Sequence, residues 1–459
     1  MRRRKALPGV VVGCCVAAVL AAASLEAQEP RVLSLEDALE LAAQNSPALR
    51  QVMNELELTA AGMRAAWGAF LPTLSLSLGT NINVNRRLQA EDNFGNPIAN
   101  PNVEWVTVSS SSQSMSAQMD LFEGGARFHE RGAERARGIA RERGVEAEMT
   151  ATWARVATSF YETIRQSDLL ELEMAILEGK RLDQESTTRL FELAVGSRVD
   201  VLAAELEVQR QERAVRQAEN EHAKAVLALR AETGATDEDN FTTSGTLPEP
   251  FDPAALDETG VIGRALEQSP LIRQNRAQVD VGRASLSAVR STRLPTISLG
   301  TFFFQDQFGQ AYTAAFKPFS SDARYASARL SLSIPVFSGF SNERNITQAQ
   351  VELANAEEQM RQTRLEIERD VRSRLIDLRG AWDSYRLAER SSEIAEERLR
   401  LAREGYRLTT VPFSDLQLAT EGAANERRTA INARYDFVAA RIALEQVVGG
   451  PLDGGTPLP

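Results

Sequence analysis

Cysteine and histidine are almost absent from this chain of 459 residues. The two cysteines, Cys14 and Cys15, are adjacent, and the two histidines, His129 and His222, lie in charged stretches far apart in the sequence. No metal-ligand cluster, catalytic set or phosphate-binding glycine pattern can be assembled from the chain. The sequence therefore predicts neither an enzyme nor a protein with a metal or a cofactor.

Basic residues are also fewer than acidic residues. The chain has 52 Lys and Arg residues against 63 Asp and Glu residues, so its formal net charge is −11. Nucleic-acid-binding surfaces are basic, because they must neutralise phosphates. This charge balance therefore excludes nucleic acid as an expected partner.

Long apolar runs are missing except at the N-terminus. There Arg2 and its basic neighbours precede an apolar stretch and small residues, the pattern of a secretory signal peptide, which we place at residues 1–27. Cleavage after Ala23, lipoprotein cleavage at Cys14 and an uncleaved anchor are the alternatives. The apolar run is shorter than the ~20 residues that a membrane-spanning helix needs.

The rest of the chain consists of two similar halves. Ser-Pro and Leu-Pro-Thr blocks recur 223 residues apart, and two later motifs recur 215 residues apart, in the same order. The pairs are 46–51 with 269–274, 71–76 with 294–299, 121–124 with 336–339, and 199–201 with 414–416. We interpret them as an internal tandem duplication. It predicts a first structural repeat at 28–234, a connector at 235–255, a second repeat at 256–448 and a flexible tail at 449–459.

Each repeat is expected to contain a short helical stretch and a long helical hairpin. Ser34 with Asp37 forms a capping-box pattern, and Ser46-Pro47 and Ser269-Pro270 resemble N-caps followed by proline, with helix to about Trp67 and Thr292. Polar helices of about seventy residues should follow Gly125 and Gly339, break near 194–197 and 410–413, and return over 199–234 and 414–448. Val371, Leu375, Leu378, Trp382 and Tyr385 have coiled-coil spacing.

Between these helices the apolar period changes from that of a helix to that of a strand. Apolar and polar residues alternate over 74–84, 115–121 and 326–336 and less regularly over 297–303, with turn-rich segments at 91–97 and 305–309. Leucine alternating with serine or asparagine fits either a soluble sheet with one wet face or a membrane barrel. Four strands cannot close a barrel, so two copies would give eight strands and three copies twelve.

The duplicated set of motifs resembles the TolC family of outer-membrane efflux proteins. The matching features are the two Ser-Pro/Leu-Pro-Thr blocks, the strand-to-helix turns at 121–125 and 336–339, and the helical tips at 195–202 and 414–416. The resemblance implies an α+β membrane protein, a homotrimer whose twelve-stranded β-barrel, with four strands per chain, continues into a long α-helical coiled-coil barrel. It implies a passive outer-membrane channel, in contact with lipid, in a Gram-negative-type cell. Its partners would be a periplasmic adaptor protein and an inner-membrane pump. A secreted structural coiled-coil protein without a channel is the alternative.

The resemblance also implies a gate at the periplasmic tips. Asp200 and Asp415 match the family's tip aspartates, and Tyr406 matches a tyrosine that hydrogen-bonds the first of them, here Asp200; helix N-capping is the alternative role for both aspartates. The family's gate arginine falls at Val411, and Arg407 and Arg198 are the candidate substitutes. Further gate or adaptor contacts are expected from Gly196, Ser197, Pro412 and Ser414.

Overall fold

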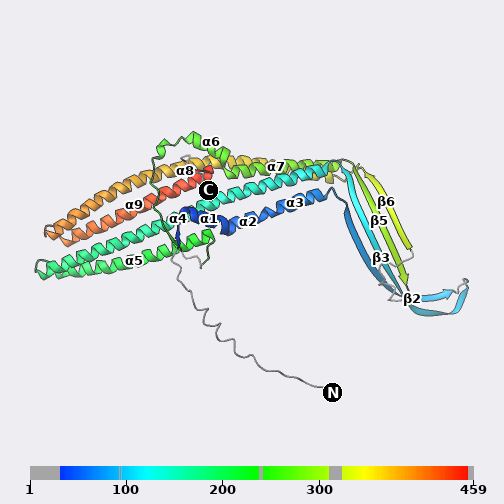
Figure 1. Cartoon of the computed structure of the whole chain (residues 1–459), viewed down its shortest axis with the longest axis horizontal. Helices are drawn as coiled ribbons and strands as arrows, with labels where there is room; N and C mark the ends of the chain where they lie inside the picture. Colours follow the sequence, from blue (N-terminus) through cyan, green and yellow to red (C-terminus); the bar gives the residue numbers. More distant parts are fainter. Residues whose placement is uncertain (1–30, 92–93, 95, 237–240, 310–322, 453–459) are drawn as a thin grey trace, which may run out of the picture.

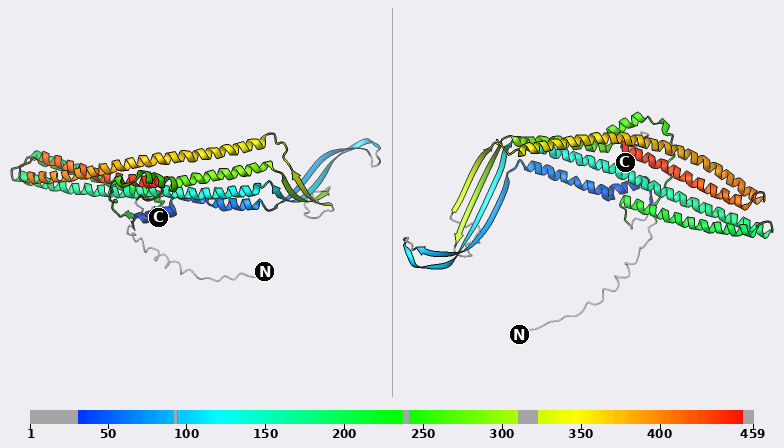
Figure 2. Two further views of the ribbon diagram at one scale, coloured as in Figure 1. Left: turned by 90° about the horizontal axis from the view of Figure 1, so that it is seen from above. Right: turned by 180° about the vertical axis from the view of Figure 1, so that it is seen from behind.

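Two very long helices dominate the chain. The computed structural model describes residues 31–91, 94, 96–236, 241–309 and 323–452, so the predicted signal peptide and most of the tail lie outside it. Helices α4 (Ala126–Glu192) and α8 (Ser341–Arg407) have 67 residues each. At about 1.5 Å per residue, each is about 100 Å long. Figures 1 and 2 show them running from the sheet to the opposite end of the molecule.

Shorter helices accompany each long helix along its length. Toward the tips, α5 (Arg198–Thr233) packs on α4 and α9 (Phe413–Val448) packs on α8, each with 36 residues. Toward the sheet, α3 (Glu57–Gly68) packs on α4, and α7 (Pro270–Arg290) packs on both long helices. Near the middle lie α1 (Leu35–Asn45), α2 (Pro47–Glu55) and α6 (Glu258–Gln268) (Figure 1). The predicted hairpins and their breaks are therefore present.

The helix starts and ends differ from the predictions in detail. Ser34 and Asp37 form the expected capping box. Ser46 and Ser269 are the N-cap residues of α2 and α7, each followed by proline, as predicted, although neither side chain makes a capping hydrogen bond. Both serines are buried. The single helix predicted to reach Trp67 is interrupted at Leu56, and α7 is followed by a 3-10 turn at Ser291–Arg293.

The apolar core follows the helix seams. Val371, Leu375 and Leu378 on α8 are fully buried, and Trp382 packs against the same cluster, which confirms the predicted spacing as a packing seam. A second cluster joins α1 and α4 to the C-terminal half of α9, for example through Phe160. Burial of each large apolar side chain contributes about 1.5–3 kcal/mol, so these seams hold the helices together.

A four-stranded antiparallel sheet continues the helices. Its strands β2 (Thr73–Glu91), β3 (Pro97–Glu123), β5 (Thr296–Gly309) and β6 (Ala323–Ser333) pair in the order β2-β3-β5-β6, which leaves β2 and β6 as edges. The predicted turn at 305–309 is wrong, because this segment pairs with β3 as part of β5. The fourth strand ends at Ser333 and not at 336, since Pro335 cannot donate a ladder hydrogen bond.

The register gives the sheet two chemically distinct faces. Leu76 lies opposite Met115, and Met115 lies opposite Phe303, on one face. On the other face Ser75 and Ser116 are hydrogen-bonded through their hydroxyls at 2.6 Å, as are Ser298 and Ser331. The leucine face is exposed in the single chain, at residues that include Leu74, Leu76, Leu78, Leu330 and Leu332.

A small parallel pairing was not predicted from the sequence. Strand β1 (Arg31–Leu33) pairs with β4 (Phe241–Thr243), which lies within the segment predicted as a connector. A strand of three residues is too short to show the two-residue period of a strand, so the sequence could not predict that β1 pairs with β4. Across the described residues, none of the helices has the combination of length and hydrophobicity needed to cross a membrane.

Candidate functional site at the two helical tips

The two hairpin tips lie together at the end of the molecule farthest from the sheet (Figure 1). The first connects α4 to α5 and the second connects α8 to α9. Tyr406, Phe413 and Leu416 of the second hairpin pack with Ala204 and Leu190 of the first in one apolar cluster. The structure therefore brings the two predicted tip regions into direct contact within a single chain.

Both tips use the same backbone turn. Ala194 and Thr409 adopt positive φ angles of 61° and 59°. The amides of Val195 and Gly196 donate to the carbonyl of Leu190, at 3.0 and 2.9 Å, and Thr410 and Val411 donate to Gly405 in the same way. Left-handed backbone at residues with a Cβ costs about 1–2 kcal/mol each, so these hydrogen bonds and the packing of the tips must offset the strain.

The glycine lies at opposite ends of the two turns: Gly196 ends the first turn, and Gly405 begins the second. In the first turn Gly196 lies against the backbone near Leu190, and an added Cβ would be 3.0 Å from the amide nitrogen of Phe191. In the second turn the glycine is on the other side: a Cβ on Gly405 would be 2.5 Å from Cγ2 of Val411. Val411, the position of the family's gate arginine, thus packs an apolar side chain onto its own turn.

Neither candidate substitute for that arginine contacts a tip aspartate. The Arg198 guanidinium lies over the ring of Phe191, 5.9 Å from its centroid, within the first hairpin. Arg407 is exposed, and its charge acts on Asp183 of α4.

The tip aspartates are not helix N-caps. Ser197 is the N-cap of α5 and accepts a hydrogen bond from the Val199 amide at 3.1 Å, and Pro412 precedes the first residue of α9. Asp200 and Asp415 are both the third residue of their helices, so the N-cap alternative is wrong. A carboxylate in the first turn still interacts favourably with the helix dipole. Asp415 and Ser414 are exposed, and Asp200 is half-buried.

Tyr406 makes a different hydrogen bond from the expected one. Its hydroxyl donates to Oγ1 of Thr187 at 3.0 Å, and the Thr187 hydroxyl donates to the carbonyl of Asp183 at 2.8 Å. The expected bond to Asp200 is therefore wrong for this conformation. Burial raises the pKa of the Tyr406 phenol; the bond to Thr187 opposes this rise, and the negative charges of Asp200 and Asp183 add to it. Asp200 is thus an electrostatic neighbour of Tyr406 but not its hydrogen-bond partner.

Behind the tips, ion pairs join neighbouring helices, and we call these ion pairs ties. None of them was predicted from the sequence. Arg403 of α8 reaches Asp183 of α4 at 3.5 Å. Burial raises the pKa of Asp183, and Arg403 only partly opposes this effect. Lys180 of α4 reaches Glu207 of α5 at 3.0 Å. Here burial also raises the pKa of Glu207, but Lys180 and Arg210 outweigh it and leave that pKa below its usual value.

A third tie lies further from the tips and joins three helices. Arg428 of α9 binds Glu173 of α4 with both nitrogens of its fork, at 2.5 and 2.9 Å. Gln211 of α5 donates to the carbonyl of Glu173 at 3.0 Å and to its carboxylate. The partners lie up to 255 residues apart, so no local sequence signal could have identified them. The second hairpin is therefore bonded to α4 at three positions along α4, through Arg403, Tyr406 and Arg428.

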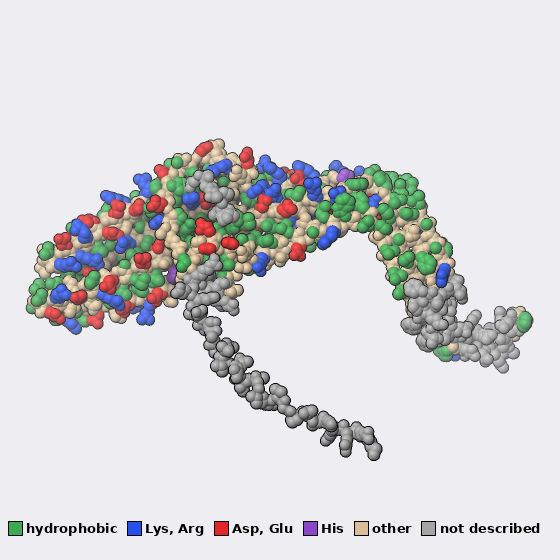
Figure 3. Space-filling model, in the orientation of Figure 1, with side chains coloured by type: hydrophobic (Ala, Val, Ile, Leu, Met, Phe, Trp, Pro, Cys, Tyr) green, Lys and Arg blue, Asp and Glu red, His purple; other side chains and the backbone are tan. Residues whose placement is uncertain are grey.

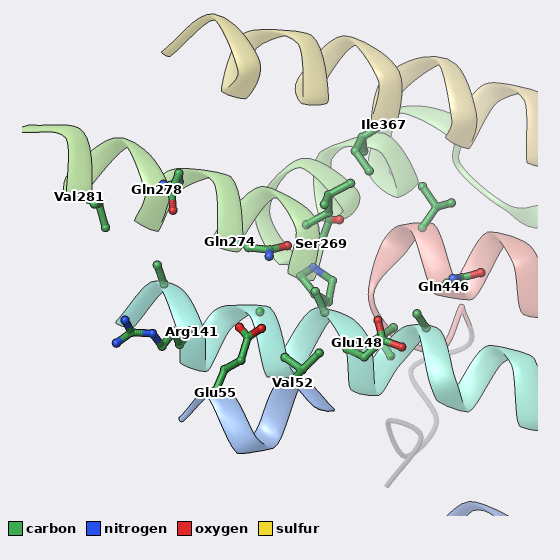
Figure 4. A pocket seen from close by; sticks show the side chains of 18 of the residues that line it. Val52, Glu55, Arg141, Glu148, Ser269, Gln274, Gln278, Val281, Ile367 and Gln446 are labelled. Carbon is green, nitrogen blue, oxygen red and sulfur yellow. The ribbon is translucent and has the colours of Figure 1, made fainter. Parts of the chain in front are cut away.

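A separate cavity of about 830 Å³ lies between α4, α7 and the ends of neighbouring helices (Figure 4). Figure 4 shows Glu55, Glu148 and Gln274 around it, from α2, α4 and α7. It contains none of the predicted tip residues. Within the described residues no group of His, Cys, Asp and Glu side chains could hold a metal ion.

Comparisons with known proteins agree with this architecture. The family model described as outer membrane efflux protein matches residues 38–235 and 261–450. The chain is 25% identical to Protein CyaE of Bordetella pertussis over 356 residues, which cover 77% of this chain and 70% of CyaE. It is 22% identical to the outer membrane protein TolC of Vibrio cholerae over 429 residues, 89% of each chain. The crystal structure of the Campylobacter jejuni CmeC outer membrane channel superimposes with a TM-score of 0.71 at 14% identity, over 92% of this chain and 87% of CmeC.

Proposed function

Because this chain belongs to the outer membrane efflux protein family, we propose that it is the passive duct of a tripartite export system, receiving solutes from a periplasmic adaptor and an inner-membrane pump. Family membership confirms the resemblance inferred from the sequence. It favours an outer-membrane efflux channel over the alternative of a secreted structural coiled-coil protein. The observation that carries the proposal is the open sheet with one leucine face, attached to helices about 100 Å long.

The edges of the sheet support a trimer. Among the described residues, strands β2 and β6 each have a strand partner on one side only, so each leaves one row of backbone N–H and C=O groups unpaired by another strand. In lipid each unsatisfied group costs several kcal/mol, so the edges must pair with other copies. Three copies give twelve strands, and a barrel of that size is wide enough for an open lumen. The equal lengths of α4 with α8 and of α5 with α9 support the proposed duplication between residues 28–234 and 256–448.

The tips are the proposed gate and adaptor-docking surface. Three copies would bring three exposed Asp415 carboxylates near one axis, with Asp200 behind them. Like charges around a narrow aqueous mouth focus a negative potential and raise the local concentration of cations. The residues proposed to contact the adaptor or complete the gate are Gly196, Ser197, Arg198, Arg407, Pro412 and Ser414. Tyr406 would stabilise the closed arrangement through Thr187.

Native mass spectrometry in detergent and planar-bilayer recording test the duct. We expect three copies per particle and a stable conductance. A matched pair of variants tests the leucine face: Leu76→Arg places a charge on that face and should cost about 2–4 kcal/mol in a bilayer, which reduces insertion. Ser77→Arg places the same charge on the serine face and should insert normally. Monomers or dimers, no conductance, or equal damage from both variants would contradict the proposal.

A further inference from the structure

The tie between Asp183 of α4 and Arg403 of α8 is poorly bonded. A contact of 3.5 Å from Nη2 of Arg403 is the only hydrogen bond that the Asp183 carboxylate accepts from a described residue. Charge-assisted bonds between nitrogen and oxygen are normally about 2.7–2.9 Å long. The Nε of Arg403 is buried and has no hydrogen-bond partner within the described part of the chain. The pair therefore recovers little of the free energy that its charges lose on leaving water.

Both side chains of this tie are largely enclosed. Asp183 is 17% exposed and Arg403 is 36% exposed. Elsewhere Figure 3 shows Lys and Arg side chains interspersed with Asp and Glu side chains over the surface of the helices, where water solvates them. Asp183 instead borders a cavity of about 20 Å³ between α4, α5 and α9, which has room for about one water molecule. Water therefore stabilises this carboxylate less than it stabilises the exposed ones.

The charges around Asp183 do not compensate for its burial. Arg403 and the next arginine on α8 lower the pKa of Asp183, as does Lys180 of α4. Lys180, however, is bonded to Glu207 of α5 at 3.0 Å. Glu207 and Glu421 of α9 line the same small cavity as Asp183. Burial outweighs the cations and raises the pKa of Asp183, so the packed hairpins disfavour its ionised form.

The tie at Glu173 has the opposite balance. Its carboxylate accepts from Nε and Nη2 of Arg428, at 2.5 and 2.9 Å, and also from Gln211. These bonds outweigh burial and lower the pKa of Glu173. Both ties join α4 to the second hairpin, but only the tie at Glu173 favours the ionised carboxylate in the packed state.

The tie at Asp183 also depends on a glycine inside α4. A Cβ on Gly179 would lie 2.7 Å from Nη2 of Arg403, so the glycine leaves the space that the guanidinium occupies. Glycine in the interior of a helix destabilises that helix relative to alanine. At this position, therefore, both the backbone of α4 and the ion pair reduce the stability of the packed hairpins.

We propose that Asp183 and Arg403 form a release element: their charges make the packed state of the two hairpins less stable, so that the tips part with a small input of free energy from a partner. The hydrogen bond from Tyr406 to Thr187, one helical turn further along α4, opposes the release element. The role in opening rests on the proposed function of the tips as a gate, whereas the effect on packing does not require a pore.

Hydrogen exchange of the full chain in detergent tests the sign of this effect. Asp183→Asn removes the charge and keeps an oxygen that can accept from Arg403. Peptides that contain residue 183 or residue 403 should exchange about fivefold more slowly than in the unsubstituted chain. This is the low end of the effect of replacing a buried pair, because both side chains are partly exposed. A double variant, Asp183→Asn with Arg403→Gln, removes both charges and should also exchange more slowly.

Glu173→Gln is the matched control, since it makes the same change from carboxylate to amide on the same helix. It should speed the exchange of peptides that contain residue 173 or residue 428, because it removes the charge from a well-bonded pair. Faster or unchanged exchange in Asp183→Asn would overturn the proposal. If that variant does not fold, the double variant decides in the same way.

Planar-bilayer recording separates the release element from the proposed function. If the tips are the gate, Asp183→Asn should lower the fraction of time that the channel is open about fivefold, and Glu173→Gln should raise it. Slower exchange in Asp183→Asn with an unchanged open fraction would support the release element and refute the gate at the tips. No conductance in any of the chains would refute the duct, and the exchange rates would still decide whether Asp183 destabilises the packed hairpins.

Discussion

The buried tie between Glu173 and Arg428 should determine how firmly the two hairpins hold together. Arg428→Met removes the guanidinium but keeps an unbranched apolar stem. The Glu173 side chain is 9% exposed and that of Arg428 is 32% exposed. Breaking a fully buried pair costs 3–5 kcal/mol, and the partial exposure of Arg428 reduces this to about 2 kcal/mol. Local opening of α4 and α9 should then become about 30-fold more frequent.

Hydrogen exchange measured by mass spectrometry reads this opening directly. Peptides that contain residue 173 or residue 428 should exchange about 30-fold faster in Arg428→Met. The neighbouring Arg427 provides a matched control, since it pairs with Glu396 at 2.7 Å but both side chains are about half exposed. Exposed pairs contribute about 0–1 kcal/mol, so Arg427→Met should change exchange little. If the two variants exchange equally, the buried tie has no special role.

The pH dependence gives an independent check. In the native chain burial raises the pKa of Glu173, but Arg428 and Gln211 outweigh burial and hold this pKa below its usual value. In the unfolded chain the pKa of Glu173 is about 4.5, and the ion pair stabilises the fold fully above that pH. This stabilisation is lost as the pH falls through the lower pKa that Glu173 has in the folded chain. Without Arg428, only Gln211 and Lys180 oppose burial, so the folded pKa of Glu173 should rise and its carboxylate should stabilise the variant less at neutral pH. The excess exchange of Arg428→Met over the native chain should therefore shrink as the pH is lowered from 7 toward about 5. A constant excess would refute this assignment.

The remaining predictions concern the tips. Tyr406→Phe and Thr187→Val each remove a hydrogen bond worth about 0.5–1.5 kcal/mol, and both should raise the single-channel conductance in planar bilayers; no change in either would exclude this bond as a latch. Asp415→Ala should weaken cation selectivity, measured as a shift in reversal potential, and also weaken block by multivalent cations; an unchanged potential would show that the carboxylate does not line the pore. Gly405→Ala should destabilise the second tip by about 1–3 kcal/mol, because the new Cβ meets Val411, and should increase proteolysis there. Adding Val411→Gly should restore resistance, and failure to do so would contradict the steric account.

Features that repeat locally could be predicted well. The alternation of apolar and polar residues located all four main strands, and the proline-free polar stretches located the two long helical hairpins. The errors lie at boundaries: β5 continues through 305–309, and the helix expected from Pro47 is interrupted at Leu56. These boundaries depend on pairing with β3 and on packing against α4, which outweigh local preference.

Side-chain partners needed the tertiary structure. The resemblance located Tyr406 at a tip, but its partner is Thr187, 219 residues away, instead of Asp200. The ties of α4 to Arg403 and Arg428 also join distant residues, which share no sequence pattern. The sequence by itself determined the periods, the lengths of the hairpins and the order of parts, because backbone hydrogen bonding and amphipathic burial repeat over a few residues. Which residues are bonded across the hairpins was decided only when the helices packed, because that packing sets which distant side chains come within a few ångströms of each other.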